Sequence, residues 1–208
     1  MFNVGEKEQF RCAVHNFRCW ADATFRDREK YGEWELEYED WESLYIAARA
    51  VIASGEWDEE VTELLIYTIA RDNEVELVVS SLSEPQLLLL ADASISSEEP
   101  DAKWQFAEHL GNLPLAAEPE RILLAFVADE NEYVRRRALM ALANLGSSHT
   151  ERLVIDAWRS GEEYQRMACL DALHCIASPQ LSKYLDLAEQ DGRPYLVGIA
   201  ERMRRNAY

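Results

Sequence analysis

Residues 129–146 decide the fold of this chain, and they run Asp129-Glu130-Asn131-Glu132-Tyr133-Val134-Arg135-Arg136-Arg137-Ala138-Leu139-Met140-Ala141-Leu142-Ala143-Asn144-Leu145-Gly146. The apolar residues recur at spacings of three and four, which is the period of a helix with one buried face. Asn131 can cap the start of such a helix, and Gly146 is a typical stop after its end. The stretch therefore predicts an amphipathic α-helix over 131–145.

The same pattern recurs in the second half of the chain, which indicates an internal repeat. A shift of 31 residues aligns the stretch with a later copy through Tyr164, Arg166, Leu170, Ala172, Leu173 and Ile176. A shift of 32 residues the other way aligns it with an earlier copy through Ala102, Lys103, Ala107, Leu110, Asn112 and Leu113. A shortened last copy begins near Arg193. Because each copy follows a shorter apolar helix, the repeating unit is a helical hairpin of about thirty residues.

The rest of the sequence is also helical in pattern. The chain has only 8 Gly and 6 Pro, too few for the many turns of an all-β protein. Helices are predicted roughly over 40–54, ending at Gly55, and over 59–72, beginning at the N-cap Asp58. Within 28–40, acidic and apolar residues alternate with a period of two. A lone short strand would have no partner, so we expect a loop or a distorted helix start there.

Seven residues of the quoted stretch give it a resemblance to the HEAT repeat: Asp129, Val134, Arg135, Ala138, Leu142, Leu145 and Gly146. In that family an acidic residue opens the second helix, Val-Arg follows, and small and leucine residues pack on the neighbouring repeat. The following copy departs from the pattern, since Gln165 replaces Val and Ala177 replaces Gly. The resemblance covers roughly 100–206. It implies that Arg135 is structural and bonds a carboxylate of its own or the next repeat.

The resemblance implies an all-α protein, an α-solenoid or HEAT-like superhelix of antiparallel helical hairpins. We expect residues 1–208 to form a single domain, with divergent acidic helical hairpins over 1–100 and HEAT-like repeats over 101–208. HEAT-like solenoids serve as scaffolds, adaptors and occasionally enzymes, so the resemblance specifies architecture more than function. Some are DNA glycosylases with a basic concave surface, and some are bilin lyases, but the sequence carries no marker of either role.

The chain is strongly acidic, with 21 Lys and Arg against 39 Asp and Glu and a net charge of −18. Residues 1–104 carry 24 acidic and 9 basic side chains, so most of the excess lies in the first half. Such a surface repels phosphates, which argues against direct binding to nucleic acid or to anionic membranes. Apolar runs such as Leu87–Ala91 are far shorter than the ~18 residues of a membrane span. With no secretory pattern at the start, we expect a cytoplasmic protein with reduced thiols and a basic protein partner.

Acidic and aromatic residues are mixed within 31–63, where eleven carboxylates are opposed by Arg49 alone. Trp41 and Tyr45 are four apart on a predicted helix and are expected in the core. Trp34 and Trp57 lie near helix ends, where the helical pattern does not require their side chains to be buried. Aromatic residues ringed by charge are typical of interface hot spots. The expected partner-binding residues of this segment are Glu33, Trp34, Glu35, Glu37, Glu39, Asp40, Glu42, Glu56, Trp57, Asp58, Glu59, Glu60 and Glu63.

No residue pattern predicts catalysis, a cofactor or a metal site. The chain has no Gly-rich phosphate loop and no G-x-S-x-G or H-E-x-x-H motif, and its four histidines have no nucleophile at a catalytic spacing. Cys12, His15 and Cys19 share one helix face and could act as metal ligands. The favoured interpretation is that both cysteines pack in the core face of that helix. Cys169 replaces an alanine of the repeat, so packing explains it too.

Small size, acidity, a cytoplasmic setting and the lack of catalytic motifs together resemble bacterial immunity proteins, some families of which are HEAT-like. The hypothesis is that the chain neutralises a basic, nuclease-type toxin by covering its active site with the acidic segment 31–63. Mimicry of nucleic-acid phosphates by ordered carboxylates would act in the same way. The alternative is a general HEAT-repeat adaptor or assembly factor that binds a partner on its concave face through Arg136, Arg137 and Met140. A steep salt dependence of binding would favour the first function.

Overall fold

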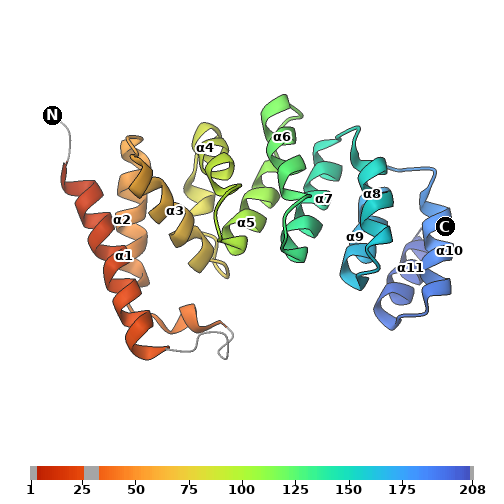
Figure 1. The fold of residues 1–208 in the computed structure, drawn as a ribbon, viewed down its shortest axis with the longest axis horizontal. Coiled ribbons are helices and arrows are strands. Elements are labelled where there is room, and N and C mark those ends of the chain that lie inside the picture. Colours follow the sequence, from red (N-terminus) through yellow and green to blue (C-terminus); the bar gives the residue numbers. More distant parts are fainter. Residues whose placement is uncertain (1–3, 26–32, 207–208) are drawn as a thin grey trace. The chain divides into compact units, whose positions relative to one another are not determined.

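The structure is a computed structural model, and it describes residues 4–25 and 33–206. Throughout this part of the chain the regular secondary structure is helical, with eleven α-helices, two short 3-10 helices and no strand (Figure 1). The prediction of an all-α protein is therefore confirmed. The chain divides into two compact units, Met1–Gln105 and Phe106–Tyr208, and the boundary falls inside helix α5 (Pro100–Leu110).

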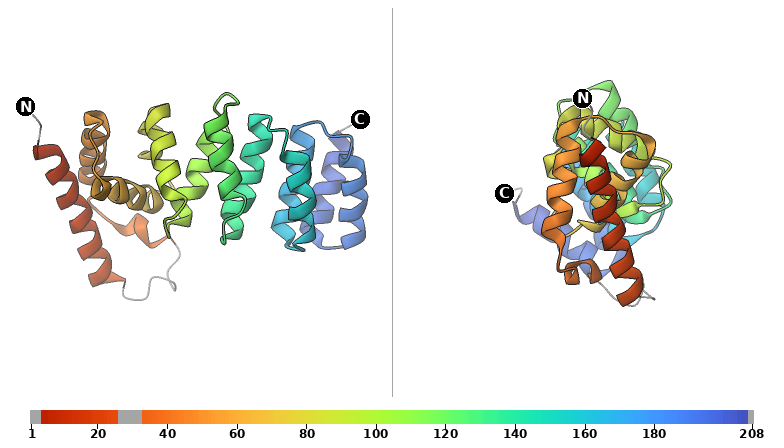
Figure 2. Two further views of the ribbon diagram at one scale, coloured as in Figure 1. Left: turned by 45° about the horizontal axis from the view of Figure 1, so that its top comes forward. Right: turned by 90° about the vertical axis from the view of Figure 1, so that its left-hand side faces the viewer.

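The first unit contains four α-helices and the first half of α5. They are α1 (Val4–Thr24), α2 (Trp41–Ser54), α3 (Glu59–Arg71) and α4 (Glu84–Ser94), with the 3-10 helices η2 (Trp34–Glu37) and η3 (Val79–Ser81). Helix α1 packs against both α2 and α3, and α3 packs against α4. Figures 1 and 2 show α1 and α2 side by side along their lengths.

The turn between α2 and α3 confirms both predicted helix ends. Gly55 follows α2 with a φ of 68°, in the left-handed region that glycine adopts at little cost. Asp58 caps α3, because its Oδ1 accepts a hydrogen bond from the Val61 amide at 2.9 Å. Between them, the indole Nε1 of Trp57 donates to the Val51 carbonyl at 2.9 Å.

A cluster of aromatic rings forms much of the core of the first unit. Phe17 of α1 is fully buried, and five other aromatic ring centroids lie within 6.2 Å of its own: those of Trp20, Trp34, Tyr38, Trp41 and Tyr67. Two of these rings come from residues 33–40, which form a single 3-10 turn and then a bend into α2. This agrees with the irregular segment expected there, of which residues 28–32 lie outside the described residues.

The second unit contains the end of α5 and six further helices. They are α6 (Ala117–Phe126), α7 (Glu132–Leu145), α8 (Thr150–Arg159), α9 (Glu163–Cys175), α10 (Leu181–Asp191) and α11 (Pro194–Asn206). The helices pack in the pairs α6/α7, α8/α9 and α10/α11, and the second helix of each pair packs on the next, α7 on α9 and α9 on α11. Leu139, Leu170 and Leu196 from these three second helices are fully buried in one core cluster.

The 31-residue repeat of the sequence is also a repeat of hydrogen bonds in the second unit. After α7, the amides of Gly146 and Ser147 bond back to the carbonyls of Ala143 and Leu142, and the amides of Ala177 and Ser178 do the same after α9. The hydroxyl of Ser147 donates to Glu120 Oε1 at 2.5 Å, and that of Ser178 donates to the corresponding Glu151. Each serine thus ties the end of one pair's second helix to its first helix.

Arg135 has the structural role that the family resemblance implies. Its Nη2 donates to Glu162 Oε2, at the start of the next pair's second helix, at 2.9 Å. Its Nη1 donates to the carbonyls of Asp129 and Glu130 at 3.0 and 2.7 Å. The side chain therefore joins two successive repeats and also fixes the turn before α7.

Candidate protein-binding surface

Two of the expected partner-binding residues are buried inside the first unit. Trp34 is 8% exposed and packs on Phe17 and Trp20, with ring centroids 5.9 and 6.0 Å apart. Glu35 is 7% exposed, and its Oε1 lies 3.9 Å from Nη1 of Arg71. These side chains support the fold and present little surface to a partner. The sequence did not reveal this burial because Phe17 and Arg71 are distant from them in the chain.

Two further carboxylates hold α1 against α3. Asp58 Oδ2 lies 3.1 Å from Arg11 Nη2 and 3.3 Å from Lys7 Nζ, and Glu60 Oε2 accepts from Arg11 Nε at 2.7 Å. The hydrogen bond from the Val61 amide, together with these cations, holds the pKa of Asp58 below its ordinary value. Asp58 and Glu60 therefore have a structural task, whatever else they do.

Eight acids of the segment are exposed and form no ion pair with any described residue: Glu33, Glu37, Glu39, Asp40, Glu42, Glu56, Glu59 and Glu63. The structure separates them into two groups at opposite ends of α2. One group, Glu33, Glu37, Glu39, Asp40 and Glu42, lies before the helix or in its first turn, whereas the other, Glu56, Glu59 and Glu63, lies beyond its last residue. With 14 residues and a rise of 1.5 Å each, the two ends of α2 lie about 20 Å apart. The segment is therefore not one continuous acidic patch.

An apolar pocket of about 190 Å³ lies beside the first of these groups. It is lined by Leu36, Trp41, Tyr45, Arg71, Asp72, Glu74 and Val75. Leu36 and Val75 are about half exposed, at 51% and 53%. The pocket therefore joins η2, the start of α2 and the loop after α3. Trp41 and Tyr45, which the sequence predicts to lie in the core, are half-buried: Trp41 packs on Phe17, and both rings also have part of their surface in this pocket.

Hydrogen bonds fix the aromatic wall of the pocket. The Trp41 indole Nε1 donates to the Glu35 carbonyl at 2.8 Å, and the Tyr45 hydroxyl donates to Asp72 Oδ1 at 2.6 Å. The two rings stack with centroids 5.2 Å apart. Burial, followed by the bond to Asp72, raises the pKa of Tyr45, so its hydroxyl remains a donor at neutral pH. The indole N–H of Trp41 and the hydroxyl of Tyr45 both have hydrogen-bond partners, and the rings expose carbon atoms to the pocket.

The cation in the lining is already neutralised. Arg71 Nη2 lies 2.8 Å from Glu99 Oε2, Nη1 lies 3.9 Å from Glu35 Oε1, and the guanidinium stacks 4.9 Å from the Tyr67 ring centroid. Six exposed acids lie in the segments that carry the lining residues, and we call them the acidic rim: Glu33, Glu37, Glu39, Asp40, Glu42 and Glu74. These segments thus combine an apolar pocket with many negative charges.

Residues Arg136, Arg137 and Met140, expected on the alternative binding face, lie on α7 in the second unit. The Arg136 guanidinium sits between two tyrosines, 4.6 Å from the Tyr133 ring centroid and 5.1 Å from that of Tyr164. Arg137 Nη2 pairs with Glu108 Oε2 at 2.6 Å. Met140 packs partly against the core cluster. These three residues belong to a different unit from the acidic rim.

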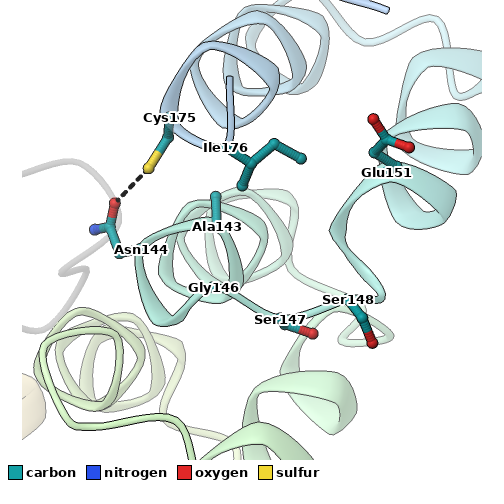
Figure 3. A pocket seen from close by; sticks show the side chains of 8 residues that line it. All are labelled: Ala143, Asn144, Gly146, Ser147, Ser148, Glu151, Cys175 and Ile176. Carbon is teal, nitrogen blue, oxygen red and sulfur yellow. Dashed lines mark hydrogen bonds between the residues drawn. The ribbon is translucent and has the colours of Figure 1, made fainter. Parts of the chain in front are cut away.

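The second unit also carries an open cleft of about 560 Å³ beside the ends of α7 and α9 (Figure 3). Its polar side chains turn towards separate partners. Cys175 Sγ lies 3.3 Å from Asn144 Oδ1, whereas the hydroxyl of Ser147 is bonded to Glu120 and the carboxylate of Glu151 to Ser178. No histidine is among the described lining residues. The cleft therefore shows no nucleophile–base pair.

The cysteines of α1 are not where the sequence placed them. Phe10, Val14 and Phe17 occupy the buried face of this helix, and Cys12 and Cys19 are exposed, so the expectation that both cysteines pack in the core face is wrong. Cys19 Sγ lies 3.4 Å from His15 Nε2. Within the described residues no three metal-binding side chains come together. Cys169, by contrast, is buried as expected, and burial raises the pKa of its thiol to about 12.

Comparison of the chain with known protein families, with characterised proteins and with solved structures finds no match. No helix in the described part of the chain is both long and apolar enough to cross a membrane. What the chain does must therefore be inferred from its own residues.

Proposed function

We propose that this chain is a protein-binding module that captures a basic protein partner at the acidic rim. The observation that carries the proposal is a set of exposed carboxylates, unpaired with any described residue, in the same segments that line an apolar pocket. Interfaces combine a desolvated apolar centre with a polar edge. Dense negative charge accelerates the encounter with a cationic protein. The acidic rim and its pocket provide both features within one unit.

The proposal also includes the architecture of the chain. The hairpins of the second unit are HEAT-like and continue as a solenoid, a fold class whose members commonly bind proteins. The 31-residue period, the recurring turn after α7 and α9, and the bridge from Arg135 to Glu162 support this architecture.

The partner we propose is a basic, nuclease-type toxin, and the chain would be its immunity protein in the bacterial cytoplasm. A nuclease needs a cationic cleft to hold phosphates. A rigid array of carboxylates matches such a cleft and would exclude its substrate. The net charge of −18 and the acidic rim support this choice of partner.

Co-expression with the C-terminal domain of the protein encoded next to this chain tests the proposal. We expect the two to form a tight complex that weakens as salt rises, and we expect cells to survive the toxic domain only when this chain is present. The absence of both complex and protection would reject the immunity function.

A general adaptor is the second candidate function, and the face around Arg136 favours it. Tyr164 and Tyr195 are exposed at 51% and 69%, and Arg136 is held by two tyrosine rings. Tyr and Arg are common hot-spot residues. Binding there would depend little on salt and would be lost in Tyr164→Ala, whereas binding at the acidic rim would be unchanged by that substitution.

A further inference from the structure

We infer that the apolar pocket of the first unit is an anchor site for one aliphatic or aromatic side chain of the partner, and that lysine or arginine flanks this side chain in the partner's sequence. The inference rests on the proposed function, since it names the chemistry that the acidic rim would recognise. It was not visible in the sequence, because the lining comes from three segments between Leu36 and Val75.

The volume of the pocket selects the kind of occupant. Sites for cofactors and small molecules occupy about 300–1,000 Å³. At about 190 Å³, this pocket is smaller than such sites, which suits a single large side chain. Its accessible lining is almost entirely carbon, so an apolar side chain gains more there than a polar one.

The walls of the pocket are held before any partner arrives. Trp41 and Tyr45 are fixed by their hydrogen bonds to the Glu35 carbonyl and to Asp72. Asp72 also accepts from the Val78 amide at 2.8 Å through Oδ2, and its carbonyl accepts from the Glu76 amide at 2.9 Å. These bonds close the loop that carries Val75. A preformed pocket spares the entropy cost of ordering these groups on binding.

The acidic rim determines which residues of the partner can lie next to the anchor side chain. Glu37 adjoins the lining residue Leu36, and Asp40 and Glu42 adjoin Trp41 on either side. Glu74 is itself part of the lining. Arg71 is already paired with Glu99, and Arg49, whose charge reaches Tyr45 and Asp72, is outnumbered by these carboxylates. A segment with lysines or arginines beside its anchor complements this mouth, and an acidic segment is repelled.

Short fluorescent peptides provide the test, with the full chain as receptor. In the probe, lysines alternate with glycines around one central leucine, and matched probes carry glycine or glutamate at the central position. Fluorescence anisotropy gives the affinity at low and at physiological salt. Burial of one leucine predicts roughly tenfold tighter binding of the leucine probe than of the glycine probe. We expect the glutamate probe to bind most weakly.

Two sets of variants separate the pocket from the charge. Leu36→Ser and Val75→Ser change half-exposed side chains, so they should fold, and we expect them to abolish the leucine preference while binding remains salt-dependent. Leu89→Ser is the control, because Leu89 is 50% exposed on α4 and does not line the pocket. The triple variant Glu37→Gln, Asp40→Asn, Glu42→Gln should weaken all probes and keep the preference for leucine.

The outcomes distinguish this inference from the proposed function. If wild type binds the leucine and glycine probes equally but in a salt-dependent way, the anchor site is refuted and the acidic rim still captures cations. If no lysine probe binds at low salt, both ideas fail. If Leu36→Ser and Val75→Ser keep the leucine preference, the preference arises elsewhere and the anchor site is refuted.

Discussion

Ala177 ends α9 in a backbone conformation that glycine adopts more readily. Its φ is 50°, and at the equivalent position after α7 Gly146 has a φ of 77°. The two residues make the same amide hydrogen bonds to the helix behind them. A Cβ in the left-handed region costs about 1–2 kcal/mol. The repeat therefore imposes this turn even where its sequence lacks glycine.

We predict that Ala177→Gly stabilises the protein by about 0.5–1 kcal/mol, because relief of the strain exceeds the extra chain entropy of glycine. Gly146→Ala should destabilise it by about 1 kcal/mol. Nothing lies within 4 Å of a Cβ placed at Gly146, so this cost is one of backbone strain alone. Urea unfolding with unchanged m-values measures both effects. A stabilising Gly146→Ala would contradict the prediction.

The pKa of Asp191 is determined by the arginines that surround its carboxyl group. Hydrogen bonds from Arg193 Nε and Nη2, at 2.6 and 2.8 Å, and from Arg166 hold the pKa of this carboxyl far below its ordinary 3.8. Arg193 Nη1 also donates to the Gly161 carbonyl at 2.9 Å. The carboxylate therefore ties Arg166 of α9 to the loop before α11, and Arg193 extends this link to the loop before α9.

For Asp191→Asn we predict a loss of about 2 kcal/mol of stability at pH 7, since hydrogen bonds to a charged group are lost. A carboxyl whose pKa is lowered by folding stabilises the fold above its unfolded pKa. The difference in the free energy of unfolding between wild type and variant should therefore have its full value above about pH 4. It should shrink as pH falls through the lower pKa of the folded state. Urea titrations from pH 7 down to acid would show this, and a gap that widens in acid would disprove it.

At the scale of helices, two glycines differ in their surroundings: one lies against a neighbouring helix, and the other has open space beside it. A Cβ at Gly111, after α5, would meet Ala141 Cα and Cβ of α7 at 2.8 and 2.9 Å. A Cβ at Gly198, inside α11, would meet nothing within 4 Å. Gly111 therefore allows a close backbone approach, whereas Gly198 only weakens its helix.

Gly111→Ala should cost about 2 kcal/mol through overpacking against α7. The matched substitution Gly198→Ala should add about 0.5–1 kcal/mol, because alanine favours the helix. Thermal and urea unfolding of the two variants compare them directly. Similar effects of the two substitutions would mean that α5 and α7 are not as close as the structure has them.

The elements also show how far sequence reasoning reaches. The ends at Gly55, Asp58 and Gly146 follow from local chemistry within a few residues, and each was predicted. The repeat followed from a fixed period along the chain. The burial of Trp34, the pairing of Arg11 with Asp58 and the pocket behind Leu36 all depend on contacts between residues far apart in sequence. Local patterns carry no information about such contacts.

At the scale of the whole molecule, the two compact units differ in net charge. The first unit has 24 acidic and 9 basic side chains, and the second has 15 and 12. Within the first unit, some carboxylates hold α1 on α3, whereas those of the acidic rim form no ion pair with a described residue. The acids Glu56, Glu59 and Glu63 at the far end of α2 have the same charge but do not line the apolar pocket. They therefore provide a control with an equal change in net charge.

The association rate with the proposed toxin partner tests the central claim most directly. Stopped-flow measurements across a range of salt would compare wild type with the triple variant Glu37→Gln, Asp40→Asn, Glu42→Gln and with the control Glu56→Gln, Glu59→Gln, Glu63→Gln. We predict that the first variant associates roughly tenfold more slowly at low salt and with a weaker salt dependence, while the control stays close to wild type. Equal rates for the two variants would contradict the claim that the acidic rim captures the partner.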